Sequence, residues 1–271
     1  DTNSNQARRV VIGITAHVDA GKTTLAEAML YRTGRLRKLG RVDHGSAAMD
    51  SHLLERERGI TIFSSQAELP IGDLEVTLLD TPGHVDFSAE MERTLSVLDY
   101  AILVISGADG VQAHTRTLWR LLELYRIPTF LFVTKMDFGR CGRGQMMEHL
   151  RHELGEGCVD FTPADRERRM EQLATCREDA LEVYLDGGEV PDALVRQLVG
   201  RRLVFPCWFG SGLKLEGIDE FLEGLARYVE PPVYPETFSA RVFKISHDPQ
   251  GKRLTCLLYT SPSPRDGATS R

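Results

Sequence analysis

Long apolar runs are missing from the sequence. No stretch of about 18 consecutive apolar residues occurs, so no segment is expected to span a membrane as a helix, and no membrane partner is predicted. The first residues carry no pattern of a secretory signal. The chain begins with Asp1 rather than Met, which predicts a piece of a longer protein.

Cysteine is scarce, and its pattern is not that of paired residues. The five cysteines are scattered, and no two of them form a CxxC pair. This usage argues against a disulfide framework and against a cysteine-based zinc site. It fits a reduced, cytoplasmic protein.

An excess of positive charge is absent as well. The 33 Lys and Arg residues are outnumbered by 39 Asp and Glu, which gives a formal charge of −6. DNA is therefore not an expected partner, and any contact with RNA would be local or made by parts outside this chain. The 271 residues, 42% apolar and 27% charged, are typical of one large or two small globular domains, and a monomer is expected.

Four apolar runs have the composition of strands that are buried on both faces. They cover residues 10–14, 76–79, 101–105 and 129–133. Helical repeats lie between them, as at Leu118, Leu121, Leu122 and Tyr125. This alternation predicts an α/β fold with a doubly wound, mostly parallel sheet, and residues 60–69 are expected to add an edge strand.

The second half of the chain is more varied. Residues 140–200 are highly charged with weak apolar repeats, which predicts a helical insertion on the outside of the sheet. A strand over 203–207 and a helix over 215–228 should return to the core. The prolines at 231 and 232 then indicate a linker. Two short strand-like pieces follow at 238–245 and 254–259, and residues 260–271 are predicted to be disordered.

A phosphate-binding loop is predicted where the first strand ends. Residues 16–24 read AHVDAGKTT, close to G-x-x-x-x-G-K-[ST] with Ala16 in the first position. Such a loop turns its amides and a helix N-terminus toward phosphate, Lys22 would reach the β- and γ-phosphates, and Thr23 would bind Mg²⁺. The alternative is a chance turn. The predicted nucleotide-binding residues of this loop are Ala20, Gly21, Lys22, Thr23 and Thr24, with Asp19 and Lys22 assigned to catalysis.

Two further segments could complete the phosphate site. Residues 80–84 read DTPGH at the end of a strand, where Asp80 could hold Mg²⁺ through water and Gly83 could offer its amide to the γ-phosphate. Residues 55–62 read ERERGITI, and Thr61 could join the Mg²⁺ shell only when the γ-phosphate is present. The alternatives are a strand-end turn and a charged loop.

Base recognition is predicted at the end of the strand 129–133. The carboxylate of Asp137, in the segment Thr134-Lys135-Met136-Asp137, can accept hydrogen bonds from guanine N1–H and the 2-amino group, which adenine does not offer. Lys135 would lie along the base plane, and amides of Ser211 and Gly212 could contact guanine O6. A turn is the alternative for each segment.

Together these segments resemble the translation-factor family of GTPases. The motifs AHVDAGKTT, RGITI, DTPGH and TKMD stand in the family's order, and the resemblance covers about residues 9–245. It implies that His84 is catalytic and orients the attacking water. It also implies that Val18 and Ile60 form an apolar gate that holds His84 away until the ribosome docks.

The gap of about 74 residues between TKMD and Gly210-Ser211-Gly212 looks most like that of the tetracycline-resistance ribosomal protection proteins, relatives of elongation factor G. This resemblance implies a domain that binds GTP and GDP with Mg²⁺ and hydrolyses GTP on the ribosome. The alternatives are a translocation factor similar to elongation factor G, a regulatory GTPase that does not act on the ribosome, and an inactive fragment. The implied domains are a GTP-binding domain over 1–233 and the truncated start of a β-barrel over 234–259. From about residue 256 onward the chain resembles no part of the family, and residues 260–271 are predicted to be a disordered tail, for which a frameshift or a cloning scar is one interpretation.

Two positions depart from the family pattern. Thr134 stands where the family has Asn, and its single hydroxyl with shorter reach would reduce guanine affinity. Gly212 stands where the family has Ala, a change expected to matter little beyond loop flexibility.

Overall fold

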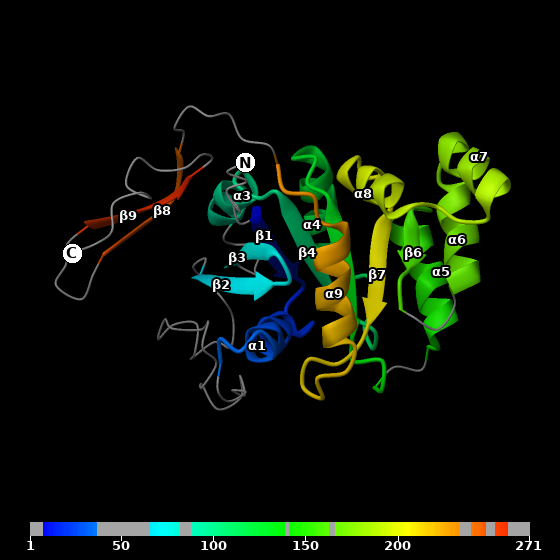
Figure 1. Cartoon of the computed structure of the whole chain (residues 1–271). Helices are drawn as coiled ribbons and strands as arrows, with labels where there is room; N and C mark the ends of the chain where they lie inside the picture. Colours follow the sequence, from blue (N-terminus) through cyan, green and yellow to red (C-terminus); the bar gives the residue numbers. More distant parts are fainter. Residues whose placement is uncertain are drawn as a thin grey trace, which may run out of the picture.

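A seven-stranded sheet with helices on both faces forms the body of the molecule (Figure 1). The computed structural model describes residues 8–36, 65–81, 88–138, 141–162, 166–232, 240–247 and 253–259. In spatial order the strands are β2 (Ser65–Ile71), β3 (Leu74–Asp80), β1 (Arg8–Ala16), β4 (Tyr100–Ser106), β5 (Thr129–Thr134), β7 (Phe205–Phe209) and β6 (Cys158–Asp160). Only the β2–β3 pair is antiparallel, which confirms the predicted doubly wound, mostly parallel sheet.

The helices pack on two separate hydrophobic cores. They are α1 (Lys22–Arg32), α3 (Ser88–Leu95), α4 (Ala113–Leu124), α5 (Arg143–Leu154), α6 (Arg166–Thr175), α7 (Glu178–Gly187), α8 (Asp192–Gly200) and α9 (Ile218–Tyr228). Along β5, Phe130 and Phe132 join the core under α1 and α9, whereas Leu131 and Val133 join the core under α4 and α5. Successive side chains of a strand point to opposite faces, so a strand covered on both faces is apolar throughout.

The segment predicted as a helical insertion over residues 140–200 contains a strand as well as helices. β6 lies between α5 and α6 and pairs in parallel with β7, so it becomes the last strand of the sheet. The helices are not confined to the outside, because Leu173, Val195 and Leu198 belong to the same core as α1 and α9. The charged surface of this segment therefore covers a buried apolar face.

Several other elements differ in their bounds from the sequence expectation. β2 begins at Ser65, while residues 60–64 lie outside the described part of the chain. α9 begins at Ile218 rather than near 215, because Leu215 and Gly217 both have a left-handed backbone, with φ of 59° and 72°, that interrupts a helix.

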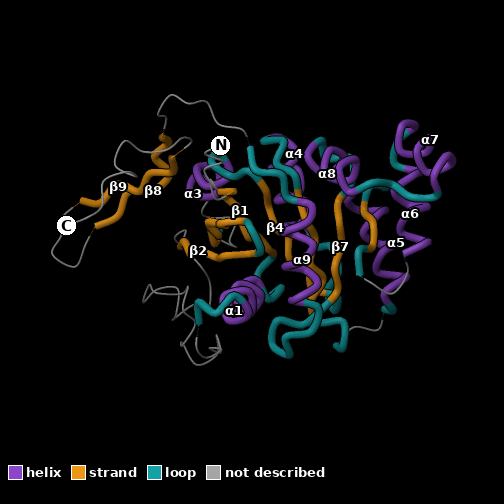
Figure 2. The backbone as a smooth tube through the Cα atoms, viewed as in Figure 1, coloured by secondary structure: helices purple, strands orange, loops and turns teal. Residues whose placement is uncertain are grey.

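The predicted strands after the linker form a hairpin. β8 (Ala240–His247) pairs in antiparallel fashion with β9 (Arg253–Tyr259) as a separate two-stranded sheet, drawn at the opposite end of the molecule from α6 and α7 (Figure 2). The tail predicted to be disordered, residues 260–271, lies outside the described residues. Across the described helices, none is long and apolar enough to cross a bilayer.

Candidate functional site

The loop between β1 and α1 has the backbone of a phosphate-binding turn. Gly21 caps α1 with φ of 92°, a left-handed conformation that strongly favours glycine, and Asp19 also has a positive φ of 61°. The Ala20 amide donates to His17 O at 3.1 Å, which closes the turn. Lys22, Thr23 and Thr24 form the first turn of α1, where the amides have no partner within the helix and carry the positive end of its dipole.

Lys22 lies at the carboxyl end of two neighbouring strands. Because β1 and β3 run parallel with Ile14 opposite Asp80, the loop after β1 and the carboxylate ending β3 meet at one edge of the sheet. Lys22 Nζ forms an ion pair with Asp80 and donates to Thr81 O at 2.7 Å. The sequence thus correctly predicts that these two residues, 58 positions apart, lie together.

The Lys22–Asp80 pair is deeply buried. Lys22 is 8% exposed and Asp80 is 0% exposed. A buried charge is tolerated when it is paired and hydrogen-bonded, and removing one partner leaves the other uncompensated. The pair therefore places a cation and an anion, both shielded from water, next to the phosphate-binding turn.

Thr134 and Lys135 tie the end of β5 to the phosphate-binding loop. The buried Thr134 hydroxyl donates to Ala20 O at 2.7 Å and lies 3.3 Å from Ile105 O. Lys135, with φ of 54°, donates through Nζ to Asp19 O at 2.5 Å. The single hydroxyl of Thr134 thus reaches the phosphate-binding loop, and the predicted reduction in guanine affinity stays a prediction.

Asp137 lies on the surface beside a lysine that the sequence analysis did not single out. Lys214 Nζ donates to Asp137 Oδ2 at 2.7 Å, and the Lys214 amide donates to Ser211 Oγ at 3.2 Å. The hydrogen bond from Lys214 lowers the pKa of Asp137. The signal in the sequence was the position of Lys214, three residues after Ser211 in the loop expected to contact the base.

Gly212 has a steric role that the sequence analysis missed. A Cβ atom at this position would lie 2.9 Å from Thr24 O and 3.0 Å from Thr24 C, which are backbone atoms at the start of α1. A side chain at residue 212 would require the loop that follows β7 or the first turn of α1 to shift from the close packing seen here. The expected small effect on the guanine contact stays a prediction, and the close approach to Thr24 adds a packing constraint that the sequence analysis did not foresee.

The predicted site residues within the described chain gather at the carboxyl edge of the central strands. The residues joined by the contacts above are Asp19, Ala20, Gly21, Lys22, Thr24, Asp80, Thr134, Lys135, Asp137, Ser211 and Gly212. The chain reverses its direction of strand addition between β1 and β4, and open α/β sheets bind ligands outside the carboxyl ends at such a point. Thr61, Gly83, His84 and Ile60 lie outside the described residues.

Comparison with known proteins finds relatives that are similar over most of this chain. The oxytetracycline resistance protein of Streptomyces rimosus is 39% identical over 279 residues, covering 92% of this chain and 42% of that protein. The tetracycline resistance protein TetM of Ureaplasma urealyticum is 36% identical over 270 residues, with coverage of 92% and 42%. A crystal structure of a protein from Thermus thermophilus matches with a TM-score of 0.84 at 27% identity, over 94% of this chain and 46% of that one.

The chain spans less than half the length of these relatives. The family model of the elongation factor Tu GTP-binding domain matches residues 7–231, which include the phosphate-binding loop, the TKMD segment and the Ser211 loop. This match covers most of the chain and agrees with the geometry of the site. The chain belongs to the family of elongation factor Tu GTP-binding domains.

Proposed function

We propose that this chain is the GTP-binding and GTP-hydrolysing domain of a ribosome-associated translation factor, most similar to the tetracycline-resistance ribosomal protection proteins. The observation that carries the proposal is the convergence of Lys22, Asp80 and Thr134 on one glycine-capped loop. The domain would occupy residues 1–233 with an insertion over about 140–200. Residues 234–259 would begin a β-barrel, and residues 260–271 would be a disordered tail.

The phosphates of the nucleotide would bind the turn between β1 and α1. The amides of Ala20, Gly21 and the first turn of α1 would donate to phosphate oxygens, and Lys22 would turn from Asp80 toward the β- and γ-phosphates. Gly83, in the DTPGH segment, would add an amide to the γ-phosphate.

A magnesium ion fits the residues beside Lys22. Mg²⁺ in nucleotide sites takes one or two protein oxygens together with phosphate and water, and Asp80 is a single buried carboxylate next to the turn of α1 that carries Thr23. Thr23, Asp80 and Thr61 would hold the ion, which when bound neutralises charge on the β- and γ-phosphates. Lys22 would no longer need Asp80 as its partner, because the phosphates would replace it.

The base would bind between the TKMD segment and the loop after β7. Asp137 would exchange Lys214 for guanine N1–H and the 2-amino group, while Lys135 lies along the base plane. Amides of Ser211 and Gly212 would contact O6. Thr134, also predicted to belong to the nucleotide site, would keep the base segment attached to the phosphate-binding loop through its hydroxyl.

Displacement of a fluorescent GDP analogue tests nucleotide binding. The 271-residue chain is mixed with the analogue and Mg²⁺, and GDP, ADP and XDP are added in turn. We expect displacement by GDP alone, and the Asp137→Asn variant should prefer XDP because an amide reverses the donor pattern at this position. Equal displacement by ADP, or unchanged guanine preference in the variant, would contradict the base assignment.

Hydrolysis needs a second experiment on the full-length parent. His84 would orient the attacking water, with Asp19 and Lys22 supporting the reaction at the phosphates. The His84→Ala variant should bind GTP normally and lose ribosome-stimulated turnover by on the order of 10²-fold. Normal stimulated turnover in this variant would remove His84 from the mechanism.

A further inference from the structure

A second concave site lies near the edge strand β6, between α5 and α6. It is a cavity of about 310 Å³ at the carboxyl end of this strand. Among the described residues, its walls include the arginines Arg143, Arg151, Arg168 and Arg169 and one acidic residue, Asp160. The cavity shares no residue with the phosphate-binding loop or the base-binding loop.

The charge of this cavity is opposite to that of the chain. Four arginines and one aspartate are among the described residues that line it, whereas the whole chain carries a formal charge of −6. Like charges gathered in a concave site repel one another, and a bound anion would relieve that repulsion. The cavity is therefore built for negative charge.

Contacts to the described residues hold Arg143, Arg151 and Arg169 through part of the guanidinium. Arg143 Nε pairs with Asp160 Oδ2 at 2.5 Å, Arg151 Nε donates to Cys158 O at 3.1 Å, and Arg169 Nη1 donates to Phe161 O at 3.3 Å. A guanidinium has five N–H donors, so each of these contacts leaves further donors for a ligand. Fixed side chains also lose less entropy when a ligand binds.

Aromatic rings lie close to two of these guanidinium groups. The guanidinium of Arg143 lies 5.5 Å from the ring centroid of Phe209, and that of Arg169 lies 5.5 Å from the ring centroid of Phe161. Arg169 Nε is buried and has no hydrogen-bond partner among the described residues. A buried donor of this kind is costly unless a ligand or water satisfies it.

The backbone of α5 adds to the same wall. Gly144, in the first turn of α5, lines the cavity, and no described atom lies within 4 Å of where its Cβ would be. First-turn amides have no partner within the helix, and they carry the positive end of the helix dipole. Gly144 thus brings the start of α5 into the wall that it shares with the arginines.

We propose that this cavity binds a phosphate group, either as a free phosphate ion or as a phosphodiester of an RNA strand. Arginine pairs with phosphate oxygens through two parallel hydrogen bonds, and a phosphate group offers more acceptor oxygens to several arginines than one carboxylate does. The volume is at the lower end of ligand sites, which run from about 300 to 1,000 Å³, so one phosphate group fits better than a whole nucleotide.

The amide signal of Gly144 in a two-dimensional NMR spectrum of the 271-residue chain reads out this cavity. Inorganic phosphate is titrated with GDP and Mg²⁺ present in excess, so that the phosphate-binding loop is filled. We expect a saturable shift of Gly144 in the wild type. Because Gly144 lies in the cavity wall, a shift of its signal reports phosphate binding there even if the chain fails to bind GDP.

Two variants give opposite expected changes. Arg168→Gln should weaken phosphate binding by about tenfold, because one charge-assisted contact is lost. Asp160→Asn should strengthen it by a similar factor, because a carboxylate in the cavity wall becomes neutral while its oxygen can still accept from the Thr162 amide. Arg166→Gln is the matched control, since Arg166 is on the same helix but pairs with Glu189 outside the cavity.

The outcomes distinguish a free phosphate ion from a phosphodiester as the ligand, and they also show when the proposal fails. If a hexamer of uridylate shifts Gly144 at lower concentration than phosphate, with the same dependence on Arg168, the ligand is a phosphodiester. If only phosphate does so, the ligand is the free ion. No saturable shift with either probe, or equal losses in the Arg166 and Arg168 variants, would overturn the proposal.

Discussion

One hydroxyl group joins the two halves of the nucleotide site. Thr134 ends β5, yet its Oγ1 donates to the carbonyl of Ala20 in the phosphate-binding loop at 2.7 Å. Both residues are buried. A hydrogen bond sheltered from water has a larger effect when it is removed, because the abandoned acceptor is left without a partner. The position of the base segment relative to the loop therefore depends on this bond.

Replacing Thr134 with Val tests this dependence. Valine keeps the shape but cannot donate, so Ala20 O loses its partner, and the free energy of unfolding should fall by about 1–3 kcal/mol. GDP affinity should fall by about tenfold, as measured with the fluorescent analogue. Thr117→Val, on the exposed face of α4, is the control and should change neither quantity. Unchanged GDP affinity in Thr134→Val would show that the two segments are held by other contacts.

Gly212 gives the second residue-scale prediction. In Gly212→Ala the new Cβ would meet the backbone of Thr24, so the loop after β7 must move away from α1. We expect a loss of about 1–3 kcal/mol in the free energy of unfolding and weaker GDP binding. Denaturant titrations and displacement assays measure these changes.

Gly187→Ala in α7 is the control for this substitution. No described atom lies within 4 Å of a Cβ at Gly187, and alanine favours helix, so stability should stay the same or rise by up to about 1 kcal/mol. A Gly212→Ala variant as stable as the wild type would mean that the loop moves away from α1 at little cost.

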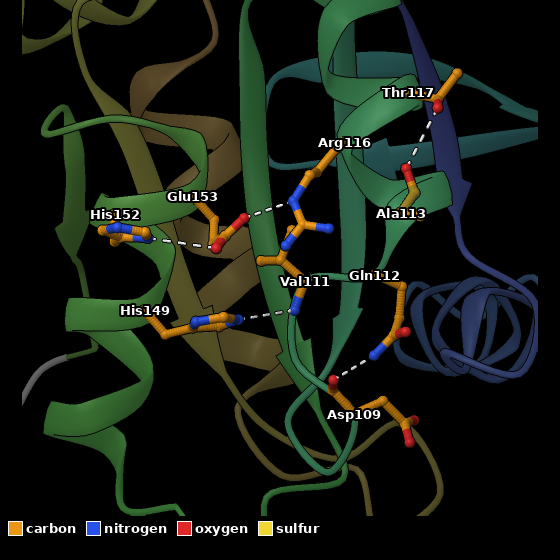
Figure 3. A network of polar contacts seen from close by, with 9 residues as sticks. All are labelled: Asp109, Val111, Gln112, Ala113, Arg116, Thr117, His149, His152 and Glu153. Atoms are coloured by element: carbon orange, nitrogen blue, oxygen red, sulfur yellow. Dashed lines mark hydrogen bonds and ion pairs between the residues drawn. The ribbon is translucent and has the colours of Figure 1, made fainter.

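At the scale of elements, a polar network ties α5 to the start of α4 (Figure 3). His149 Nε2 accepts the Val111 amide at 3.1 Å. One turn further along α5, Glu153 accepts from Arg116 at 2.5 Å, a hydrogen bond that lowers the pKa of Glu153. These contacts fix two helices on the same face of the sheet and hold the loop between β4 and α4.

Replacing His149 with Phe should destabilise this pair of helices. The Val111 amide would lose its acceptor, at a cost of about 1–3 kcal/mol in the free energy of unfolding. His152, whose side chain is 84% exposed on the same helix, offers the control, and His152→Phe should stay within about 0.5 kcal/mol of the wild type. Urea denaturation measures both variants. If both variants are as stable as the wild type, water accepts the hydrogen bond of the Val111 amide in place of His149 Nε2.

Much of the element order could be predicted from the sequence. The runs that became β1, β3, β4 and β5 are apolar on both faces, and that composition separates them from amphipathic helices. β6 could not be predicted, because three residues are too few to show a period. It is a strand only because β7 offers a free edge.

The candidate site likewise has contacts that could be predicted from the sequence and contacts that could not. Lys22 and Asp80 could be placed together because each follows a strand that ends at the same edge of a parallel sheet. The Lys214–Asp137 contact depends on side-chain reach between two loops, and the role of Gly212 depends on a close approach of backbones. Neither feature produces a periodic pattern in the sequence. The roles of Thr61, Gly83 and His84 stay predictions.

At the scale of the whole molecule, the packing of the sheet controls the chemistry of the thiols. Cys158 and Cys207 are buried in the same core, and burial raises the pKa of Cys207 well above its usual range. Burial likewise raises the pKa of Cys176 to about 11. The reactive form is the thiolate, which for Cys176 would be about one part in a thousand at pH 8.

Alkylation of the native chain tests this packing. Iodoacetamide at pH 8 should modify the half-buried Cys141 well before Cys176 and Cys207, as followed by mass spectrometry of peptides. All five cysteines should react within the same time in denaturant. Rapid labelling of Cys207 in the native chain would show that the core between α5 and the sheet opens readily.

The strand order has a consequence for the length of the chain. β5 and β7 are neighbours in the sheet, and α5 alone could connect them as an ordinary strand–helix–strand unit. β6 with α6, α7 and α8 is a detour that leaves this unit, adds one strand at the edge and returns. Such a detour can lengthen, shrink or disappear between related proteins while Asp137 and Ser211 keep their separation. An engineer could therefore graft a reporter or a second binding module there and leave the two base-facing loops in register.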